Sequence, residues 1–215
     1  MKIPYKIATV ITLLLCALPA RGEERLTLEP VSGSAHIEVS GTSSLHDWTV
    51  TGAQINGYVK VPPQFLSAPS LDTLESLTQS HLNPELEAII PTDSLKSGKK
   101  IMDSKMYKAL GKGEHPEIRY RLKQIQTLPA EAWPSQEGNW FATVGDLTVA
   151  GVSTEISLPM NIKRTGSQQV LWSGTHKLKM TDFEIPPPTA MLGTLKTGDD
   201  VTISFTWLLG EPQDL

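Results

Sequence analysis

The sequence predicts an all-β domain of about eight antiparallel strands, arranged as a barrel or a sandwich. Three observations indicate this fold class: apolar and polar residues alternate over many short segments, turn residues separate these segments, and helices do not recur between them as a parallel sheet requires. No internal repeat, linker or low-complexity stretch divides the chain. We therefore expect a single domain over residues 23–215, preceded by a signal peptide.

The first predicted element is this secretory signal peptide, residues 1–22. Lys2 and Lys6 provide a positive start, about 12 mostly apolar residues follow, and the small residues Ala20 and Gly22 suit a cleavage site. The apolar run is shorter than the roughly 20 residues that a transmembrane helix needs. We therefore expect a periplasmic or secreted protein without stable membrane insertion.

Cleavage changes the composition of the chain. Cys16 is the only cysteine, so the mature protein has no disulfide and depends on its hydrophobic core for stability. Cys16 also leaves a lipoprotein anchor open, although Leu15 before it is larger than such sites usually allow. Loss of three positive charges takes the formal net charge from −4 to about −7. An acidic chain without a basic stripe excludes nucleic acid as a partner and argues against binding to anionic membranes by charge.

The clearest strands show unbroken alternation, which places one face against a core and the other in water. Their apolar faces are Ile55, Val59 and Val61; Ile156, Leu158, Met160 and Ile162; and Val201, Ile203, Phe205, Trp207 and Leu209. Weaker alternation covers residues 34–40, 84–92, 117–126, 139–149 and 168–180. Glycine-containing turns separate many of these segments, as expected for short antiparallel connections.

Two segments interrupt the strands. Residues 98–110 are predicted to be helical, with Ser97 capping the start, Gly111 providing a left-handed stop, and an apolar stripe of Met102, Met106, Ala109 and Leu110. Residues 62–83 form a long proline-containing connection, with a short helix starting at Asp72. A connection of this length is typical of a lid or binding loop, and equally of a tolerated insertion.

Two short motifs match elements of penicillin-recognising serine enzymes. Ser97-Gly98-Lys99-Lys100 fits S-x-x-K, and Lys196-Thr197-Gly198 fits K-T-G. No S-D-N element lies between them, and the helical domain that such enzymes need is missing. We therefore expect no catalytic residues.

The histidines do not follow a metal-binding pattern. None of the five pairs with another at ligand spacing, although His36 and His46 on neighbouring strands leave an assembled site open. His46-Asp47 has the composition of an acid–base pair, but no nucleophile lies nearby in the sequence. We interpret Asp47 as part of a turn before a strand that starts at Trp48, and we expect neither a metal nor a cofactor.

Large aromatic residues are concentrated in the predicted strands. They are Trp48, Phe141, Trp172, Phe205 and Trp207. Such residues either fill the core or line a cavity for an apolar chain. Both outcomes stay open, because a barrel of about eight strands is just wide enough to be packed by side chains or to hold one small ligand.

Three motifs occur in order along the chain. Residues 41–49 read Gly-Thr-Ser-Ser-Leu-His-Asp-Trp-Thr, residues 94–118 run from Ser-Leu-Lys-Ser-Gly through the predicted helix to His-Pro-Glu-Ile, and residues 145–152 read Gly-Asp-Leu-Thr-Val-Ala-Gly-Val. Thr-Asp-Phe and three prolines follow within residues 181–188. Over roughly residues 30–209, these motifs resemble the YceI-like family of lipid- and polyisoprenoid-binding proteins.

The resemblance implies a lipocalin-like barrel whose hydrophobic interior takes up a long isoprenoid or quinone-like chain outside the cytoplasm. It also places both serine-enzyme motifs on family landmarks that carry no catalysis. Two features depart from the family: the 62–83 connection is longer than expected, and Glu184 stands where glycine is usual.

We therefore expect a non-enzymatic protein that binds or transports an isoprenoid or other lipophilic molecule in the barrel interior. The alternative is a β-sandwich interaction module of the cell envelope without a ligand cavity, and a homodimer is left open. No binding residue is carried over from the family, so the predicted contacts rest on the strand pattern. They are Trp48, Ile55, Phe141, Leu147, Trp172, Phe205 and Trp207, with His46, Asp47 and Tyr58 as polar contacts near the mouth.

Overall fold

The computed structural model of the protein describes residues 25–67, 84–128, 131, 139–166, 168–190 and 195–212. The predicted signal peptide and residues 68–83 of the predicted connection, including the helix expected at Asp72, lie outside these ranges.

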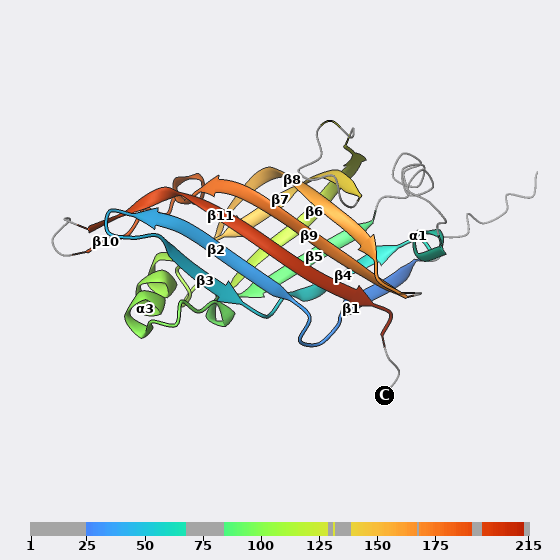
Figure 1. Ribbon diagram of the computed structural model, residues 1–215, viewed down its shortest axis with the longest axis horizontal. Coiled ribbons are helices and arrows are strands. Elements are labelled where there is room, and N and C mark those ends of the chain that lie inside the picture. Colours follow the sequence, from blue (N-terminus) through green and yellow to red (C-terminus); the bar gives the residue numbers. More distant parts are fainter. Residues whose placement is uncertain are drawn as a thin grey trace, which may run out of the picture.

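Eight antiparallel strands form a closed ring (Figure 1). In spatial order they are β1 (Leu26–Pro30), β4 (Asn56–Val61), β5 (Glu85–Pro91), β6 (Glu117–Thr127), β7 (Trp140–Val149), β8 (Val152–Arg164), β9 (Gln169–Lys179) and β11 (Leu195–Gly210). The ring closes where β1 pairs with the end of β11, through Glu29 opposite Gly210 and Pro30 opposite Leu209. The predicted all-β, lipocalin-like barrel is confirmed, and the sandwich arrangement is wrong.

A second hairpin extends the wall of the barrel beyond β1 and β4. It consists of β2 (His36–Ser43) and β3 (Trp48–Gly52), and β2 pairs with β11 between Thr197 and Thr206. Because β11 is 16 residues long, it holds β1 and β2 one after the other along the same edge. A single bridge from Thr51 to Lys96 ties β3 to the segment after β5, and the two-residue β10 (Thr189–Ala190) pairs with the start of β11.

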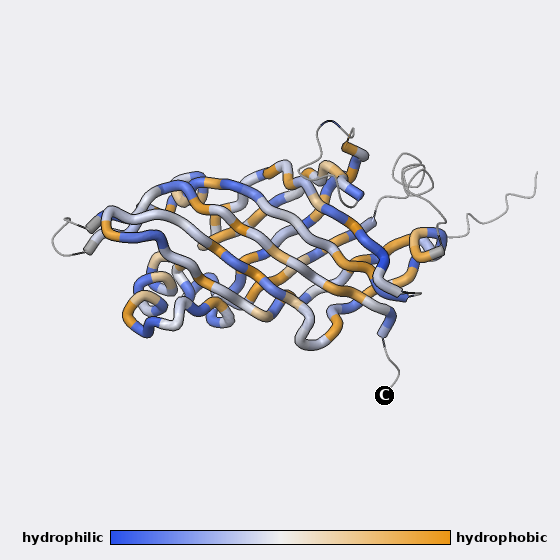
Figure 2. Tube along the Cα trace, in the orientation of Figure 1, coloured by the Kyte–Doolittle hydropathy of each residue, from blue (hydrophilic) through white to orange (hydrophobic). Residues whose placement is uncertain are grey.

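The eight strand segments predicted by alternation are all strands, and the alternation sets which face points inward. Figure 2 shows apolar and polar residues alternating along the barrel. Val59 and Val61 are fully buried and Ile55 is 4% exposed, as expected for one inward face. Strand β1 was not predicted, because its five residues are too few to show a clear alternation.

The predicted helix is present as α3 (Lys100–Ala109), but its start differs from the prediction. Ser97 does not cap α3, since the N-cap is Lys99 and no side chain bonds to the cap position. Instead, the Asp103 carboxylate accepts hydrogen bonds from the Ser97 backbone N–H (2.8 Å) and hydroxyl (2.6 Å). Gly111 has φ 60° and ends the helix, as predicted.

Short helices complete the fold. These are α1 (Gln64–Ser67) and the 3₁₀ turns η1 (Thr92–Ser94) and η3 (Met180–Phe183). α3 and β10 lie at one end of the elongated barrel, whereas α1 and the C-terminal end of β11 lie at the other (Figure 1). The two ends of the barrel are therefore built differently.

Candidate ligand cavity

The barrel encloses a cavity of about 960 Å³. This volume falls within the roughly 300–1,000 Å³ that is usual for small-molecule sites. Its wall is the inward face of the strands: along β11, for example, Val201, Ile203, Phe205 and Trp207 line the cavity, whereas the intervening Thr202, Ser204 and Thr206 do not. The period-two pattern of the sequence thus produces a continuous apolar surface.

The cavity ends part-way down the barrel, where the interior becomes solid. Trp172 and Trp207 form its floor, and both are almost completely buried. Beneath Trp172 lies Phe65 of α1, with ring centroids 6.4 Å apart and the planes inclined by 13°. The Trp207 indole donates a hydrogen bond to the carbonyl oxygen of Ile55 at 3.1 Å, which fixes the second ring.

Below this floor, the barrel is a packed core. Leu28, Val59, Val61, Val170 and Leu209 are fully buried and do not line the cavity. Arg164 at the end of β8 donates a hydrogen bond to the carbonyl oxygen of Leu66 (2.8 Å) and so holds α1 across this end. The barrel is therefore packed in the half near α1 and hollow in the half near α3.

Helix α3 contributes to the cavity at its open end. Met102, Met106 and Ala109, which belong to the predicted apolar stripe, line the cavity together with Leu110 just after the helix. The stripe therefore faces the ligand space. Methionine suits such a surface, because its flexible side chain adapts to different apolar shapes.

The cavity offers few polar groups. The Tyr120 hydroxyl donates to Thr143 Oγ1 (3.1 Å), which donates to the carbonyl oxygen of Leu158 (2.7 Å), and burial raises the pKa of Tyr120. Burial lowers the pKa of His176, which also lines the cavity. Both shifts favour the uncharged forms, and no carboxylate is found among the described lining residues. The interior is suited to an uncharged, apolar molecule.

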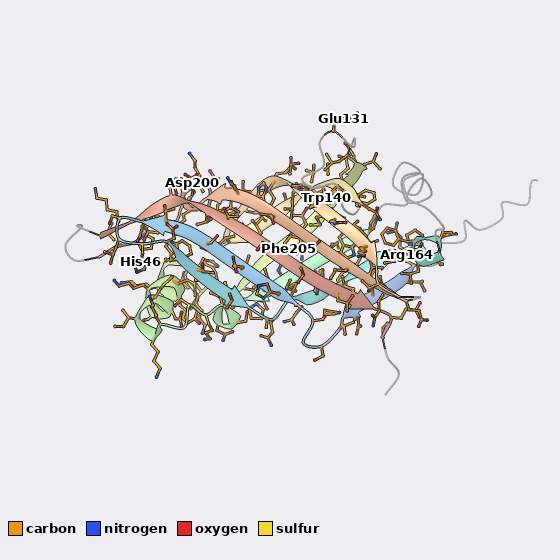
Figure 3. The ribbon with its side chains drawn as sticks, viewed as in Figure 1. His46, Glu131, Trp140, Arg164, Asp200 and Phe205 are labelled. Carbon is orange, nitrogen blue, oxygen red and sulfur yellow. The ribbon has the colours of Figure 1, made fainter. Side chains whose placement is uncertain are left out.

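Seven of the predicted contact residues line the cavity. They are His46, Trp48, Ile55, Leu147, Trp172, Phe205 and Trp207. Figure 3 shows His46 at the end of the barrel that carries α3, Arg164 at the opposite end, and Phe205 between them. The fold thus brings these residues, which lie far apart in the sequence, together around one cavity.

The other three predicted contacts do not line it. Phe141 shares the inward face of β7 with Leu147, but it lies in the packed half and is 2% exposed. Tyr58 points outward because its neighbour Val59 points inward, and its ring packs under the Lys60 ammonium at 5.0 Å. Asp47 is exposed in the turn before β3, where its carbonyl oxygen accepts a hydrogen bond from His46 Nδ1 (2.8 Å).

Several lining residues were not predicted as contacts. They include Tyr120, His176, Leu178, Met180, Phe183 and Ile185, besides those of α3. Alternation along residues 168–180 placed His176 and Leu178 on the same face as Trp172, so this signal was available. The turn η3 gave no comparable signal, because a 3₁₀ turn has neither the strand nor the helix period.

The structure gives the serine-enzyme motifs a different role. Ser97 does not line the cavity, and its hydroxyl bonds to the Asp103 carboxylate and to the backbone of Lys99, not to a lysine side chain. Within the described ranges, no group of three or more His, Cys, Asp or Glu residues is arranged to hold a metal. None of the described helices is long and apolar enough to cross a membrane.

Comparison with known proteins assigns the family. The sequence profile of the YceI-like domain matches residues 27–208. The chain belongs to the YceI-like family. This confirms the resemblance that the sequence motifs indicated, whereas none of the curated proteins compared with this YceI-like chain matches it.

Solved structures of three bacterial proteins are similar in fold to this YceI-like chain. BcnA from Burkholderia cenocepacia has a TM-score of 0.59 at 16% identity, covering 81% of this chain and 95% of BcnA. A polyisoprenoid-binding domain from Saccharophagus degradans, implicated in plant cell wall breakdown, has a TM-score of 0.60 at 12% identity, covering 87% and 99%. The YceI protein of Campylobacter jejuni has a TM-score of 0.52 at 16% identity, covering 77% and 85%. At these identities, the similarity establishes the fold alone.

Proposed function

We propose that this YceI-like protein is a non-enzymatic carrier that holds a long apolar ligand, a polyisoprenoid or quinone-like lipid, in the hollow half of the barrel. The observation that carries the proposal is the apolar cavity of about 960 Å³, floored by Trp172 and Trp207 and open beside α3. The similarity to the polyisoprenoid-binding domain from Saccharophagus degradans supports the ligand class. An interaction module without a cavity would need a filled interior, so the cavity argues against that alternative.

Energetics favour transfer over tight storage. Moving one five-carbon isoprene unit out of water is worth on the order of 3 to 4 kcal/mol. Such a lipid starts in a bilayer that is equally apolar, so the net affinity for the protein is modest. A floor part-way down the barrel limits how much chain is enclosed, and the cavity wall then selects ligands by chain shape.

A further part of the proposal concerns location. The charged start, apolar run and small residues of positions 1–22 support export and cleavage, which give a periplasmic or secreted carrier of residues 23–215. The mass of the protein purified from the producing cell tests this, because cleavage removes residues 1–22, the single cysteine among them. A full-length mass would contradict it.

The cavity can be tested with a pair of substitutions on one strand. Ile203→Trp places a large ring into the cavity, whereas Thr202→Trp places the same ring on the outer face one residue away. We expect organic extraction and mass spectrometry to find lipid in the wild type and in Thr202→Trp, and at least fivefold less lipid in Ile203→Trp. Empty wild-type protein after repeated purifications, or equal lipid in both variants, would contradict the proposal.

A further inference from the structure

We propose that the mouth of the cavity docks on the surface of an anionic lipid bilayer, so that the ligand passes between membrane and barrel without crossing water. This inference rests on the proposed carrier function, and it adds a partner: a membrane surface that carries negatively charged headgroups. It is carried by two features of the mouth, exposed aliphatic side chains and unpaired lysines.

The aliphatic side chains are Leu45 and Ile101. Leu45 lies in the turn between β2 and β3 and is 68% exposed, and Ile101 lies in the first turn of α3 and is 77% exposed. They are the exposed large hydrophobic residues among those that the structure describes, and both line the cavity mouth. Two separate elements thus hold apolar side chains in water at the one place where a lipid must enter, and a bilayer interface can cover both of them.

Four lysines surround the same opening. Lys99 and Lys100 lie at the start of α3, Lys105 in its middle and Lys196 at the start of β11, and all four are exposed. Across the described ranges none of them forms an ion pair. Lys60, Lys112 and Lys123 have carboxylate partners, whereas Lys163, Lys177 and Lys179 on the barrel have none among the described residues either. The mouth is therefore distinguished by the gathering of its lysines, and not by the lack of ion pairs alone.

The charge of the mouth is opposite to that of the chain. The whole protein has a formal net charge of −4, yet the described lining residues include four lysines and no Asp or Glu. The acidic residue of α3, Asp103, does not line the cavity, and its carboxylate accepts hydrogen bonds from Ser97. Asp47, exposed in the turn before β3 and two residues from Leu45, carries an opposing charge. A local cluster of this kind orients the mouth toward negative charge although the remainder of the chain is acidic.

A bilayer accounts for this arrangement better than a charged ligand headgroup does. The cavity walls inside are apolar, and the lysines at the rim belong to two elements, three at α3 and one on β11. A headgroup would also leave Leu45 and Ile101 in water, whereas an interface covers them. Each lysine near an anionic membrane strengthens binding about fivefold, so four lysines attract the mouth substantially. Repulsion between the membrane and the acidic remainder of the chain reduces this attraction.

Vesicle flotation with the mature protein tests the proposal. We expect binding to phosphatidylcholine vesicles that contain phosphatidylglycerol, weaker binding to phosphatidylcholine alone, and loss of the difference at high salt. Lys105→Glu and the double variant Leu45→Ser, Ile101→Ser should each lower binding to the anionic vesicles at least fivefold. Lys163→Glu is the matched control, because it makes the same charge change on β8 next to Arg164, at the α1 end.

A second measurement separates docking from ligand recognition. Uptake of a soluble apolar fluorescent probe without vesicles should be equal in the wild type and Lys163→Glu. Lys105→Glu and the Leu45→Ser, Ile101→Ser variant should lose clearly less probe uptake than vesicle binding, because the substituted side chains lie at the rim of the cavity. Equal vesicle binding by Lys105→Glu and Lys163→Glu, or no preference for phosphatidylglycerol, would overturn the docking proposal. A loss of probe uptake in Lys105→Glu as large as its loss of vesicle binding would overturn it, because Lys105 would then act on the ligand and not on the membrane. A wild type that floats with anionic vesicles but takes up no probe would instead contradict the carrier function.

Discussion

Glu184 has a backbone conformation that most side chains avoid. It follows η3 with φ 56° and ψ 21°, in the left-handed region, at the position where the family resemblance led us to expect glycine. For a residue with a Cβ atom, this conformation costs roughly 1–2 kcal/mol, whereas glycine adopts it readily. The turn is retained because the N–H of Glu184 bonds to the carbonyl oxygen of Thr181 (3.2 Å) and Phe183 is buried beside the cavity.

Glu184→Gly should therefore stabilise the protein. We expect the free energy of unfolding in urea to rise by about 0.5–1 kcal/mol, because relief of the left-handed strain exceeds the extra entropy that glycine has in the unfolded chain. Glu184→Ala is the control, since it removes the charge but keeps Cβ. An equal gain in Glu184→Ala would show that the charge, and not the backbone, is the cause.

A cavity-lining residue can be predicted from the sequence only where the alternation of its strand shows which side chains point inward. Phe205 and Trp207 face inward in an unbroken alternation, so their orientation follows from the strand period alone. Tyr58 was placed near the mouth without regard to its neighbours Val59 and Val61, and the same period puts it outside. Phe141 faces inward as predicted but lies in the packed half, which its own strand does not reveal.

At the scale of elements, β5 and β6 are joined on the outer face by a charged group as well as by their ladder. Glu87 on β5 accepts hydrogen bonds from Arg119 Nη1 (2.7 Å) and Arg121 Nε (2.9 Å) on β6, and its side chain is 15% exposed. Burial alone would raise the pKa of Glu87, but the hydrogen bonds and charges of the two arginines outweigh it and leave the pKa lowered. The carboxylate form is therefore the one that the folded state prefers.

This shift predicts a pH dependence of stability. A carboxyl with a lowered folded pKa stabilises the protein fully above its unfolded value of 4.5, and that contribution is lost as the pH falls through the lower folded value. We expect Glu87→Gln to melt below the wild type at pH 7, and the difference in melting temperature to shrink as the pH falls below 4.5. Glu85→Gln on the same strand is the control, because its ion pairs are longer, at 3.5 Å. A gap for Glu87→Gln that stays constant with pH would contradict the assignment.

Helix α3 was predicted as an element, but its contribution to the cavity wall was not. Its apolar stripe is compatible with any core, and only its position over the open half of the barrel turns Met102 and Met106 into cavity wall. The helix is held by side-chain bonds that no propensity indicates: Asp103 to Ser97, and the Tyr107 hydroxyl to the carbonyl oxygen of Leu95 at 2.7 Å.

For the whole molecule, the division into a packed and a hollow half has a thermodynamic consequence. The packed half supplies the core that holds the barrel closed, so the hollow half can remain unfilled without the chain losing its fold. A ligand that binds only the folded state then adds stability. At a ligand concentration about 100 times the dissociation constant, the gain is about 2.7 kcal/mol.

Differential scanning calorimetry can measure this gain. For a chain of this size, about 2.7 kcal/mol corresponds to a rise in melting temperature of roughly 5–10 °C on saturation with an apolar ligand. Ile203→Trp should show little or no rise, because the ring occupies the ligand space. A rise of the same size in Ile203→Trp would place the ligand outside the cavity.

The amino-acid sequence by itself determined which segments form strands and which face of each strand is apolar. These are local properties: side chains alternate at every second residue, so Ile203 and Phe205 must share a face wherever the strand lies. Family motifs added the barrel and the expectation of a lipid ligand. Only the tertiary structure decided that Trp172 forms the floor of the cavity and Leu147 its wall. It also placed Lys105 and Lys196 at the rim of the same cavity. Those outcomes depend on the distances between elements that are far apart in the chain. These distances are set by how the ring closes through β1 and β11, and the residue pattern within a single element does not reveal them.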